Sequence, residues 1–263
     1  PRAREDLMTT PKAVPPPDVQ AGRGDLRVLY VADRHDAPYR YRCLNPGLQL
    51  RADGTPCDIL HLQDSRLDDL LPRYSVVVLF RLPWSRRVEA VTEAARRCGA
   101  TLVFDIDDLV FDPGLAASLP FLANAPKLRR LQHEVAGERL LRTFEACDAF
   151  LGATPALARA ASARGKPAFV HPNLLHPHQV RASTLIHGLR GCLQRRPMMA
   201  YMSGSITHNE DLAMISPVLA RIMSERKDVT LMIGGFLVPD EFLSALADRI
   251  IRLPFQDWRV QPW

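Results

Sequence analysis

Short apolar runs alternate with segments of helical periodicity along most of this chain. The runs expected to form strands are Leu26–Ala32, Cys57–Leu62, Tyr74–Phe80, Thr101–Asp105, Ala149–Gly152 and Ala168–His171. Such alternation is typical of βαβ units, in which successive strands run parallel. The first run, LRVLYVA, is apolar throughout, which predicts a strand buried on both faces. We therefore expect an α/β fold with a doubly wound parallel sheet of about six strands.

Helical patterns lie between these runs. They cover Tyr39–Leu50 with an interruption near Pro46, Ser65–Leu71, Ser85–Cys98, Pro126–Cys147 and Pro155–Arg164. Gly99 is placed to end the third of these helices as a C-cap, and Pro126 stands at a first position, where proline is tolerated.

The same alternation restarts after a break. The segment 174–197 lacks strong periodicity and suits a linker or a connecting helix. Strands are then expected at Met198–Met202, Val229–Ile233 and Ile250–Leu253, with helices at Asn209–Arg226 and Asp240–Leu246. We therefore expect a Rossmann-like N-terminal lobe over 25–173 and a partial second Rossmann-like lobe over 198–263. Residues 1–24, with Pro15–Pro17, are expected to form a disordered or loosely attached leader.

Composition narrows the class of protein. Apolar residues make up 47% and charged residues 24%, and no apolar run approaches the roughly 18 residues of a membrane span. The N-terminus lacks the apolar core of a secretory signal, and it also lacks an initiator Met, so we expect a piece of a longer chain. Five cysteines without a CxxC pair indicate neither a zinc site nor a disulfide framework, so a reducing, cytoplasmic setting is predicted.

The net charge of +5 is unevenly distributed. Between Ala125 and Pro197 twelve Lys or Arg residues stand against four acidic ones. This excess forms either a solvated face or a surface for an anionic partner, such as a sugar nucleotide, a lipid phosphate or an acidic membrane surface. No nucleic-acid partner is expected, because aromatic residues are only 7% and none alternate with the basic ones.

Polar residues follow several of the predicted strands, and ligands of open parallel sheets lie at that edge. The residues concerned are Asp33-Arg34-His35, Tyr39-Arg40-Tyr41-Arg42, Arg81, and the cluster Asp105, Asp107 and Asp108. Three close carboxylates repel one another, which raises at least one pKa, and such a carboxylate can act as a base on a sugar hydroxyl. Alternatively, Asp105 or Asp108 caps the next turn, and a metal site is a third interpretation.

A second candidate lies where the second lobe's first strand meets its helix. The segment Met202–Asn209 contains Gly204, Ser205, Thr207 and His208, and Gly234-Gly235 follows the next strand. Glycine permits close backbone approach, and free N–H groups at a helix N-terminus favour a diphosphate. An ordinary strand–turn–helix with an N-cap explains the same residues.

Two further features of the sequence bear on its function. His171, His176 and His178 fall within eight residues, but a turn at the lobe junction fits them better than a metal site. No GxGxxG follows the first strand, and neither GxxxxGK[ST] nor GxSxG occurs in the sequence. These absences argue against a dehydrogenase, a P-loop NTPase and an α/β-hydrolase.

Several stretches together resemble the GT-B class of glycosyltransferases, especially bacterial family-four-like enzymes that build surface polysaccharides. They are Tyr39–Arg42 with Asn45-Pro46, Phe104–Asp112 (FDIDDLVFD), Ser203–Leu212 (SGSITHNEDL, similar to the SGTxTHxxDL segment of such proteins), and Arg252–Phe255 with Trp258. The likeness spans about Leu26 to Trp258.

The resemblance implies transfer of a sugar from a nucleotide-diphosphate donor to a glycan or lipid-linked acceptor. It implies no required metal and no other cofactor, with the enzyme in the cytoplasm or at the inner face of the membrane. On this analogy Asp107 and Asp108 are catalytic, and Arg40, Arg42 and Arg81 face the acceptor. The donor-binding residues would be Gly204, Ser205, Thr207, His208, Gly234 and Gly235.

The sequence departs from the family pattern in one respect. The Glu-x7-Glu motif that grips the donor in such enzymes occurs nowhere in the chain. The chain is therefore either part of a glycosyltransferase or a non-catalytic relative that binds a glycan, lipid or protein. A flavodoxin-like regulatory domain accounts for the first lobe alone. An incomplete second lobe would leave apolar surface uncovered, which predicts self-association from about Met198 onward.

Overall fold

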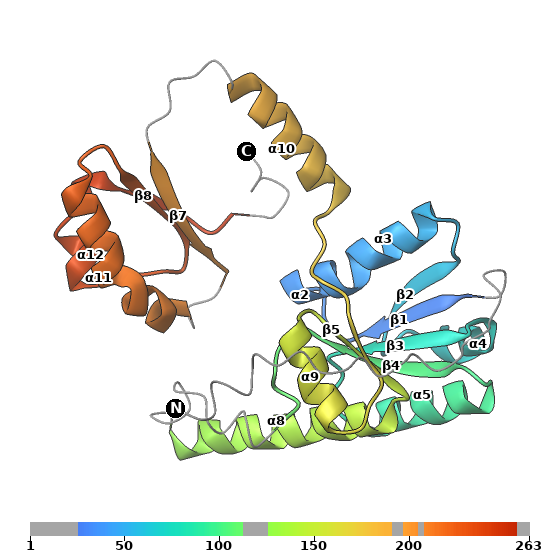
Figure 1. The fold of residues 1–263 in the computed structure, drawn as a ribbon. Helices are drawn as coiled ribbons and strands as arrows, with labels where there is room; N and C mark the ends of the chain where they lie inside the picture. Colours follow the sequence, from blue (N-terminus) through green and yellow to red (C-terminus); the bar gives the residue numbers. More distant parts are fainter. Residues whose placement is uncertain (1–25, 113–125, 191–196, 205–207, 257–263) are drawn as a thin grey trace. The chain divides into compact units, whose positions relative to one another are not determined.

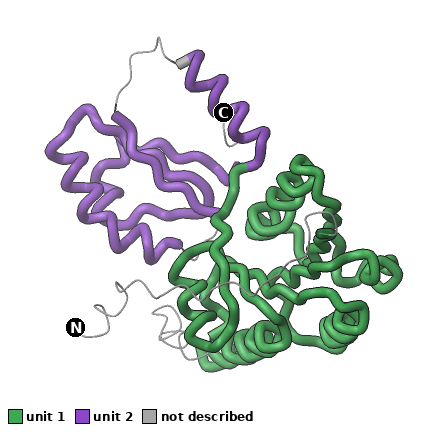
Figure 2. Tube along the Cα trace, turned by 45° about the vertical axis from the view of Figure 1, so that its right-hand side comes forward, with its two compact units in different colours: residues 1–175 green, residues 176–263 purple. Residues whose placement is uncertain are grey.

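The computed structural model describes residues 26–112, 126–190, 197–204 and 208–256 (Figure 1). The chain divides into two compact units, Pro1–Leu175 and His176–Trp263 (Figure 2). The division lies inside the predicted linker 174–197, most of which is the helix α10 (Pro177–Arg190). The predicted leader 1–24 lies outside the described residues.

The first unit contains a parallel sheet with six strands in the described part of the chain. The strands are β1 (Val28–Ala32), β2 (Cys57–His61), β3 (Val76–Phe80), β4 (Thr101–Ile106), β5 (Ala149–Gly152) and β6 (Ala168–Val170), in the order β2-β1-β3-β4-β5-β6. All five residues of β1 are buried, as its continuous apolar run predicts. The predicted fold class is confirmed.

Helices cover both faces of this sheet. They are α2 (Ala37–Tyr39), the π-helix η2 (Arg40–Leu44), α3 (Asn45–Ala52), α4 (Leu67–Leu70), the 3₁₀ turn η3 (Leu71–Arg73), α5 (Arg86–Arg97), α8 (Lys127–Ala146) and α9 (Pro155–Ala163). Figure 1 shows α3 on one side of the sheet and α5 and α8 on the other. Leu29 and Val31 of β1 face the α5–α8 side, whereas Val28 and Tyr30 pack with Cys43 of η2. Burying each such aliphatic side chain stabilises the fold by about 1.5–3 kcal/mol.

The segment around Pro46 differs from the prediction. No break occurs at Pro46; instead, the helical path continues from α2 to α3 through the π-helix η2. The Asn45 N–H donates to the Arg40 carbonyl, one residue further back than in an α-helix. Pro46 has no N–H for the Arg42 carbonyl, so a wider turn at this point loses little.

Phenylalanines anchor the segment that follows β4. Phe104, Phe111, Phe144 and Phe150 contact one another at ring-centroid distances of 5.1–6.3 Å. Phe111 is fully buried in this cluster, so the apolar residues of FDIDDLVFD hold the segment while its aspartates remain at the strand end.

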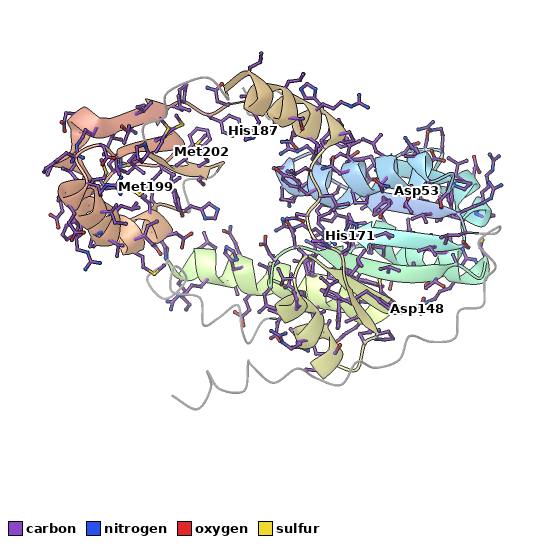
Figure 3. All side chains as sticks on the ribbon, turned by 45° about the horizontal axis from the view of Figure 1, so that its top comes forward. Asp53, Asp148, His171, His187, Met199 and Met202 are labelled. Carbon is purple, nitrogen blue, oxygen red and sulfur yellow. The ribbon has the colours of Figure 1, made fainter. Side chains whose placement is uncertain are left out.

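The second unit contains three parallel strands in the order β7-β8-β9 among its described residues. Its elements are α10, β7 (Met198–Ser203), α11 (Asn209–Glu225), β8 (Thr230–Gly235), α12 (Glu241–Ser244), the 3₁₀ turn η5 (Ala247–Arg249) and β9 (Ile250–Leu253). One sheet face packs on α11 and α12 through Leu212, Leu231 and Leu243. The residues of the opposite face include Met198 and Met202, which are 52% and 44% exposed (Figure 3 labels Met202).

Among the helices of the described residues, none has the length and apolar character needed to cross a membrane.

Candidate functional site

The order of the strands locates a candidate site in the first unit. From β1 the chain moves to β2 on one side, then returns to β3 on the other side of β1. The loops that follow β1 and β3 therefore diverge, and ligands of doubly wound sheets bind in the space between them.

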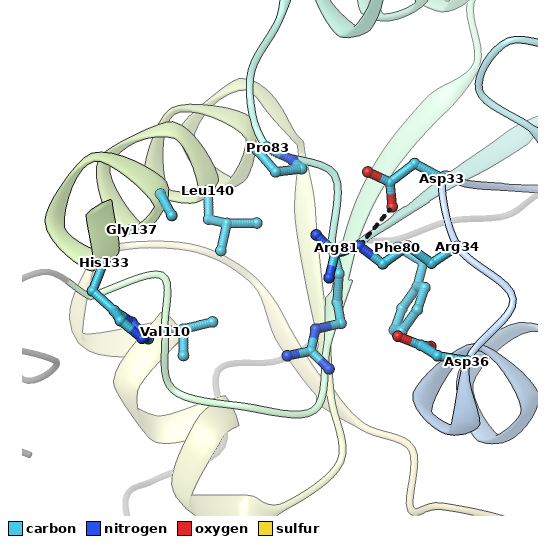
Figure 4. A pocket seen from close by; sticks show the side chains of 11 residues that line it. Asp33, Arg34, Asp36, Phe80, Arg81, Pro83, Val110, His133, Gly137 and Leu140 are labelled. Carbon is cyan, nitrogen blue, oxygen red and sulfur yellow. Dashed lines mark ion pairs between the residues drawn. The ribbon is translucent and has the colours of Figure 1, made fainter. Parts of the chain in front are cut away.

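A pocket of about 240 Å³ lies at this point (Figure 4). Its lining comes from the loop after β1, from the end of β3 and the loop that follows it, from Val110, and from α8. The residues are Asp33, Arg34, Asp36, Phe80, Arg81, Pro83, Val110, His133, Ala136, Gly137 and Leu140. Figure 4 shows α8 on one side, the loop after β1 on the other, and Arg81 between them.

Arg81 has an unusual backbone. Its φ is +48°, the only positive φ of a non-glycine residue in the part of the chain that the structure describes. A left-handed conformation costs an L-residue about 1–2 kcal/mol and persists only where its surroundings enforce it. Here the Arg81 N–H donates to the Asp105 carbonyl over 2.9 Å, which ties the end of β3 to the end of β4.

The Arg81 guanidinium binds two of the predicted catalytic residues. Its Nη1 lies 3.2 Å from Asp107 Oδ1, and its Nη2 lies 2.7 Å from Asp108 Oδ2. Asp107 is mostly buried, whereas the Asp108 side chain is more than half exposed. Burial raises the pKa of Asp107 above its ordinary value, although the charge of Arg81 opposes this shift. The structure thus brings Asp107 and Asp108 together on Arg81, which lines the pocket, although the two carboxylates are not among the lining residues.

Two of the residues predicted to face the acceptor are buried instead. Arg42 has no exposed surface and forms a bidentate pair with Asp105, with Nε–Oδ1 and Nη2–Oδ2 distances of 2.8 and 2.7 Å. Arg40 is also buried, its guanidinium stacked on the Tyr41 ring at 4.6 Å. The acceptor-binding prediction for Arg40 and Arg42 does not fit this burial. The turns of η2 direct these side chains inward, which residue type alone does not indicate.

The pair of Arg42 and Asp105 also holds the chain where it leaves β6. Arg42 Nη1 donates to the His171 carbonyl, and Asn45 Nδ2 donates to the Leu174 carbonyl over 2.6 Å. Burial raises the pKa of Asp105 to about 6 despite Arg42, so the carboxyl is ionised at neutral pH. Burial and the charge of Arg42 both lower the pKa of His171. Asp105 therefore has a structural role, since it pairs with Arg42 through its carboxylate and accepts the Arg81 N–H through its carbonyl.

The histidines near the unit boundary have local partners. His171 Nδ1 lies 3.5 Å from Arg42 Nη1, a cation that disfavours a metal ion there. His176 Nδ1 accepts the His178 N–H over 3.1 Å, as in a turn. Within the described ranges, no group of three or more His, Cys, Asp or Glu residues is arranged to hold a metal ion.

The second unit contains the predicted donor-binding residues. Gly204 directly follows β7, whereas Ser205 and Thr207 lie outside the described residues. His208 stands at the N-cap of α11 and contacts Asp211 Oδ2 through Nδ1 at 2.8 Å. Gly234 and Gly235 end β8.

Two details of this turn bear on a diphosphate. Asn209 Oδ1 accepts the Val238 N–H over 2.8 Å, so the loops that follow β7 and β8 are joined. Glu210 and Asp211 occupy the first turn of α11, where their carboxylates already balance the helix dipole and repel further negative charge.

Sequence reasoning missed the wall that α8 contributes to the pocket. His133, Gly137 and Leu140 lie about a hundred residues after β1, on a helix without a local signal of function. Asp36, which caps α2 by accepting the Tyr39 N–H over 3.0 Å, was also missed, although it directly follows Asp33-Arg34-His35 in the sequence. Only the packing of α8 beside the two strand ends reveals the residues of that helix.

No model of a known protein family matches this sequence, and no curated protein is similar to it. Several solved structures match this chain at low sequence identity. A putative UDP-N-acetylglucosamine 2-epimerase from Listeria monocytogenes is 13% identical over 89% of this chain and 70% of its own, with a TM-score of 0.46.

LpCGTa in complex with UDP is 13% identical over 89% of this chain and 71% of its own, with a TM-score of 0.49. The UDP-GlcNAc 2-epimerase from Neisseria meningitidis, bound to UDP-GlcNAc, is 10% identical over 90% of this chain and 73% of its own, with a TM-score of 0.48. At these identities the likeness is one of general α/β architecture.

Proposed function

We propose that this chain takes part in glycosyl transfer from a nucleotide-diphosphate sugar to a hydroxyl group of a glycan or lipid-linked acceptor. The observation that carries the proposal is the pocket where β1 and β3 diverge, whose lining residue Arg81 pairs with the mostly buried carboxylate of Asp107.

The pocket is the proposed acceptor site. Its volume of about 240 Å³ suits a single sugar unit better than a larger ligand. Asp33, Asp36 and His133 supply groups that hydrogen-bond hydroxyls, while Phe80 and Leu140 offer apolar surface to the C–H face of a sugar ring. Arg34 adds a cation for the phosphate of a lipid-linked acceptor.

Asp107 is the proposed general base. A carboxyl whose pKa burial has raised is a stronger base than a solvated one, so it accepts a proton from the attacking hydroxyl more readily. Arg81 orients the Asp107 carboxylate, and because it lines the pocket it also contacts the acceptor. Asp108, which also pairs with Arg81, is more exposed and would assist.

The donor is proposed to bind the second unit, with its diphosphate at the turn of Gly204, Ser205, Thr207 and His208 and beside Gly234 and Gly235. Backbone N–H groups at the start of α11 are suited to phosphate oxygens. The proposal includes no required metal. On this proposal the protein acts in polysaccharide biosynthesis, in the cytoplasm or at the inner face of the membrane.

A second candidate is a non-catalytic protein that binds a glycan through the same pocket. The pairing of Arg81 with both Asp107 and Asp108 supports it, because the guanidinium already occupies both carboxylates and its charge opposes the rise that burial causes in the pKa of Asp107. The absence of a Glu-x7-Glu motif from the sequence supports it as well.

Titration calorimetry against UDP-, GDP-, ADP- and dTDP-sugars, combined with an assay for release of the nucleoside diphosphate, tests the first proposal. We expect Asp107→Asn to lower turnover by roughly 10²- to 10⁴-fold without changing donor affinity. Asp112→Asn is the matched control, because Asp112 lies in the same segment but pairs with Arg164 at 2.9 Å.

Failure of the wild-type protein to bind any sugar nucleotide would refute the proposal. Binding without turnover, unaffected by Asp107→Asn, would instead favour the non-catalytic candidate.

A further inference from the structure

A glycine lies in the wall that α8 contributes to the pocket of the first unit. His133, Gly137 and Leu140 all line this pocket, and they are spaced by four and three residues (Figure 4). Residues three and four apart lie on the same face of an α-helix. A side chain at position 137 would therefore lie between those of His133 and Leu140 and extend into the pocket.

Glycine is unfavourable for the helix at this position. Gly137 lies in the interior of α8, where glycine destabilises a helix relative to alanine because it loses more conformational freedom on folding. The reason for the glycine therefore lies outside the helix. Either α8 packs so closely on its neighbours that no side chain fits, or the missing side chain leaves space for a ligand.

The loop after β3 holds α8 beside the pocket. Trp84, which follows the pocket residue Pro83, donates its N–H to the Arg139 carbonyl over 2.9 Å. Arg139 Nε in turn donates to the Trp84 carbonyl over 2.8 Å, and the Arg142 guanidinium lies over the Trp84 ring at 4.5 Å from its centroid. One turn of helix further on, Phe144 is buried in the core. Because these contacts fix the position of α8, the space beside Gly137 stays open.

We propose that Gly137 sets the size of the acceptor that the pocket admits; this inference rests on the proposed acceptor site. The pocket has a volume of about 240 Å³, so even one added methyl group takes space that a single sugar unit needs. With glycine at this position, a pyranose ring can approach the backbone of α8 between His133 and Leu140. The acceptor class is thus a glycoside whose whole terminal pyranose ring enters the pocket.

The two possible reasons for the glycine predict opposite effects on stability. If α8 needs glycine for close packing, Gly137→Ala overpacks the interior and destabilises the fold. If the space belongs to a ligand, the unliganded protein accommodates the methyl group, and alanine stabilises α8 through its higher helix propensity. We therefore expect Gly137→Ala to raise the urea concentration at the midpoint of unfolding.

The test is binding of the methyl glycosides of glucose, galactose, mannose and N-acetylglucosamine to the whole chain, measured by ligand-detected NMR titration. Gly137→Ala should raise the Kd of each glycoside that the wild type binds by roughly 5- to 150-fold, because the methyl group overpacks the occupied pocket. Gly137→Leu introduces a larger side chain that also favours helix, so it should abolish binding while the chain stays folded.

Gly188→Ala is the matched control. Gly188 lies in the helix α10, where an added Cβ atom would meet nothing within 4 Å. The same substitution there should leave the Kd of every glycoside unchanged, because it adds a methyl group to a helix that does not line the pocket.

The outcomes separate this inference from the proposed function. If the wild-type chain binds none of the four glycosides, the acceptor site and the role of Gly137 both fail. If it binds them and Gly137→Ala binds equally well, or if Gly188→Ala loses as much affinity, only the role of Gly137 fails. A lower midpoint of unfolding for Gly137→Ala would also overturn that role, because the glycine would then serve the packing of α8.

Discussion

Arg42 carries a full positive charge at a position without exposed surface, and its surroundings explain how the fold tolerates it. Asp105 supplies a bidentate carboxylate and His171 a carbonyl, so all three guanidinium nitrogens have partners. Such a pair gains little net stability over apolar residues of the same size, but loss of one member leaves the other charge buried and alone.

At the residue scale we therefore expect Arg42→Met to lower the free energy of unfolding by about 3–5 kcal/mol at pH 7, measured by urea denaturation. Adding Asp105→Leu should restore part of the loss, because no buried charge then remains, although the His171 carbonyl still lacks its donor. Glu93→Gln, which removes an exposed partner of Arg97 on α5, should cost about 0.5 kcal/mol or less.

The free energy of unfolding lost in Arg42→Met should also depend on pH, and the Asp105 carboxyl sets the direction of this dependence. Its pKa is raised from 3.8 to about 6 by burial, so the folded protein binds this proton more tightly than the unfolded chain. The contribution to stability is complete below about pH 4 and is lost as the pH rises through about 6. Without Arg42 the pKa rises further, so the deficit of Arg42→Met should grow from pH 5 to pH 8. A constant deficit would contradict this account.

At the scale of elements, some features depend on residues nearby in the sequence, whereas others depend on contacts between distant residues. Ser85 accepts the Val88 N–H at the start of α5 over 3.2 Å, and Gly99 ends the segment with φ +74°. Both caps were predictable, because they depend on backbone groups within a few residues. The π-helix η2 was not, since its inward arginines depend on Asp105 and His171, which are remote in sequence.

Gly235 combines a local and a tertiary requirement. Its φ is +88°, and a Cβ atom there would lie 1.7 Å from the Ser203 carbonyl oxygen of the neighbouring strand. At Gly99 φ is also positive, +74°, but a Cβ atom would meet nothing within 4 Å.

We expect Gly235→Ala to disrupt the pairing of β7 with β8, detected as faster hydrogen exchange of their amides. Gly99→Ala should cost only the backbone strain of about 1–2 kcal/mol and leave exchange in β3 and β4 near that of the wild type. Equal effects of the two substitutions would show that the contact with Ser203 is unimportant.

At the scale of the whole molecule, the second unit has one covered sheet face and one with exposed apolar side chains. The exposed side chains include Met198, Met202 and Ile251. Contiguous apolar surface of this kind favours association.

We accordingly expect the apparent mass in light scattering to increase with protein concentration. The double change Met198→Lys and Met202→Lys should suppress the increase, because charged side chains on this face resist burial. Met214→Lys, at a residue of α11 that is 74% exposed, should leave it unaltered. A wild-type chain that stays monomeric at high concentration would rule this out.

The sequence by itself determined the elements and their class. Apolar runs such as LRVLYVA and capping residues such as Ser85 act within one strand or one helical turn, so the strands of both sheets and most helices could be predicted. The gathering of Arg81, Asp107 and Asp108 could be anticipated too, because parallel strands place their carboxyl ends at one edge.

Only the tertiary structure decided which polar residues face a ligand. The order β2-β1-β3 opened the pocket, α8 completed its wall, and the packing of η2 buried Arg40 and Arg42. These outcomes depend on contacts between residues far apart in the chain. A local pattern of residues does not predict the energies of such contacts.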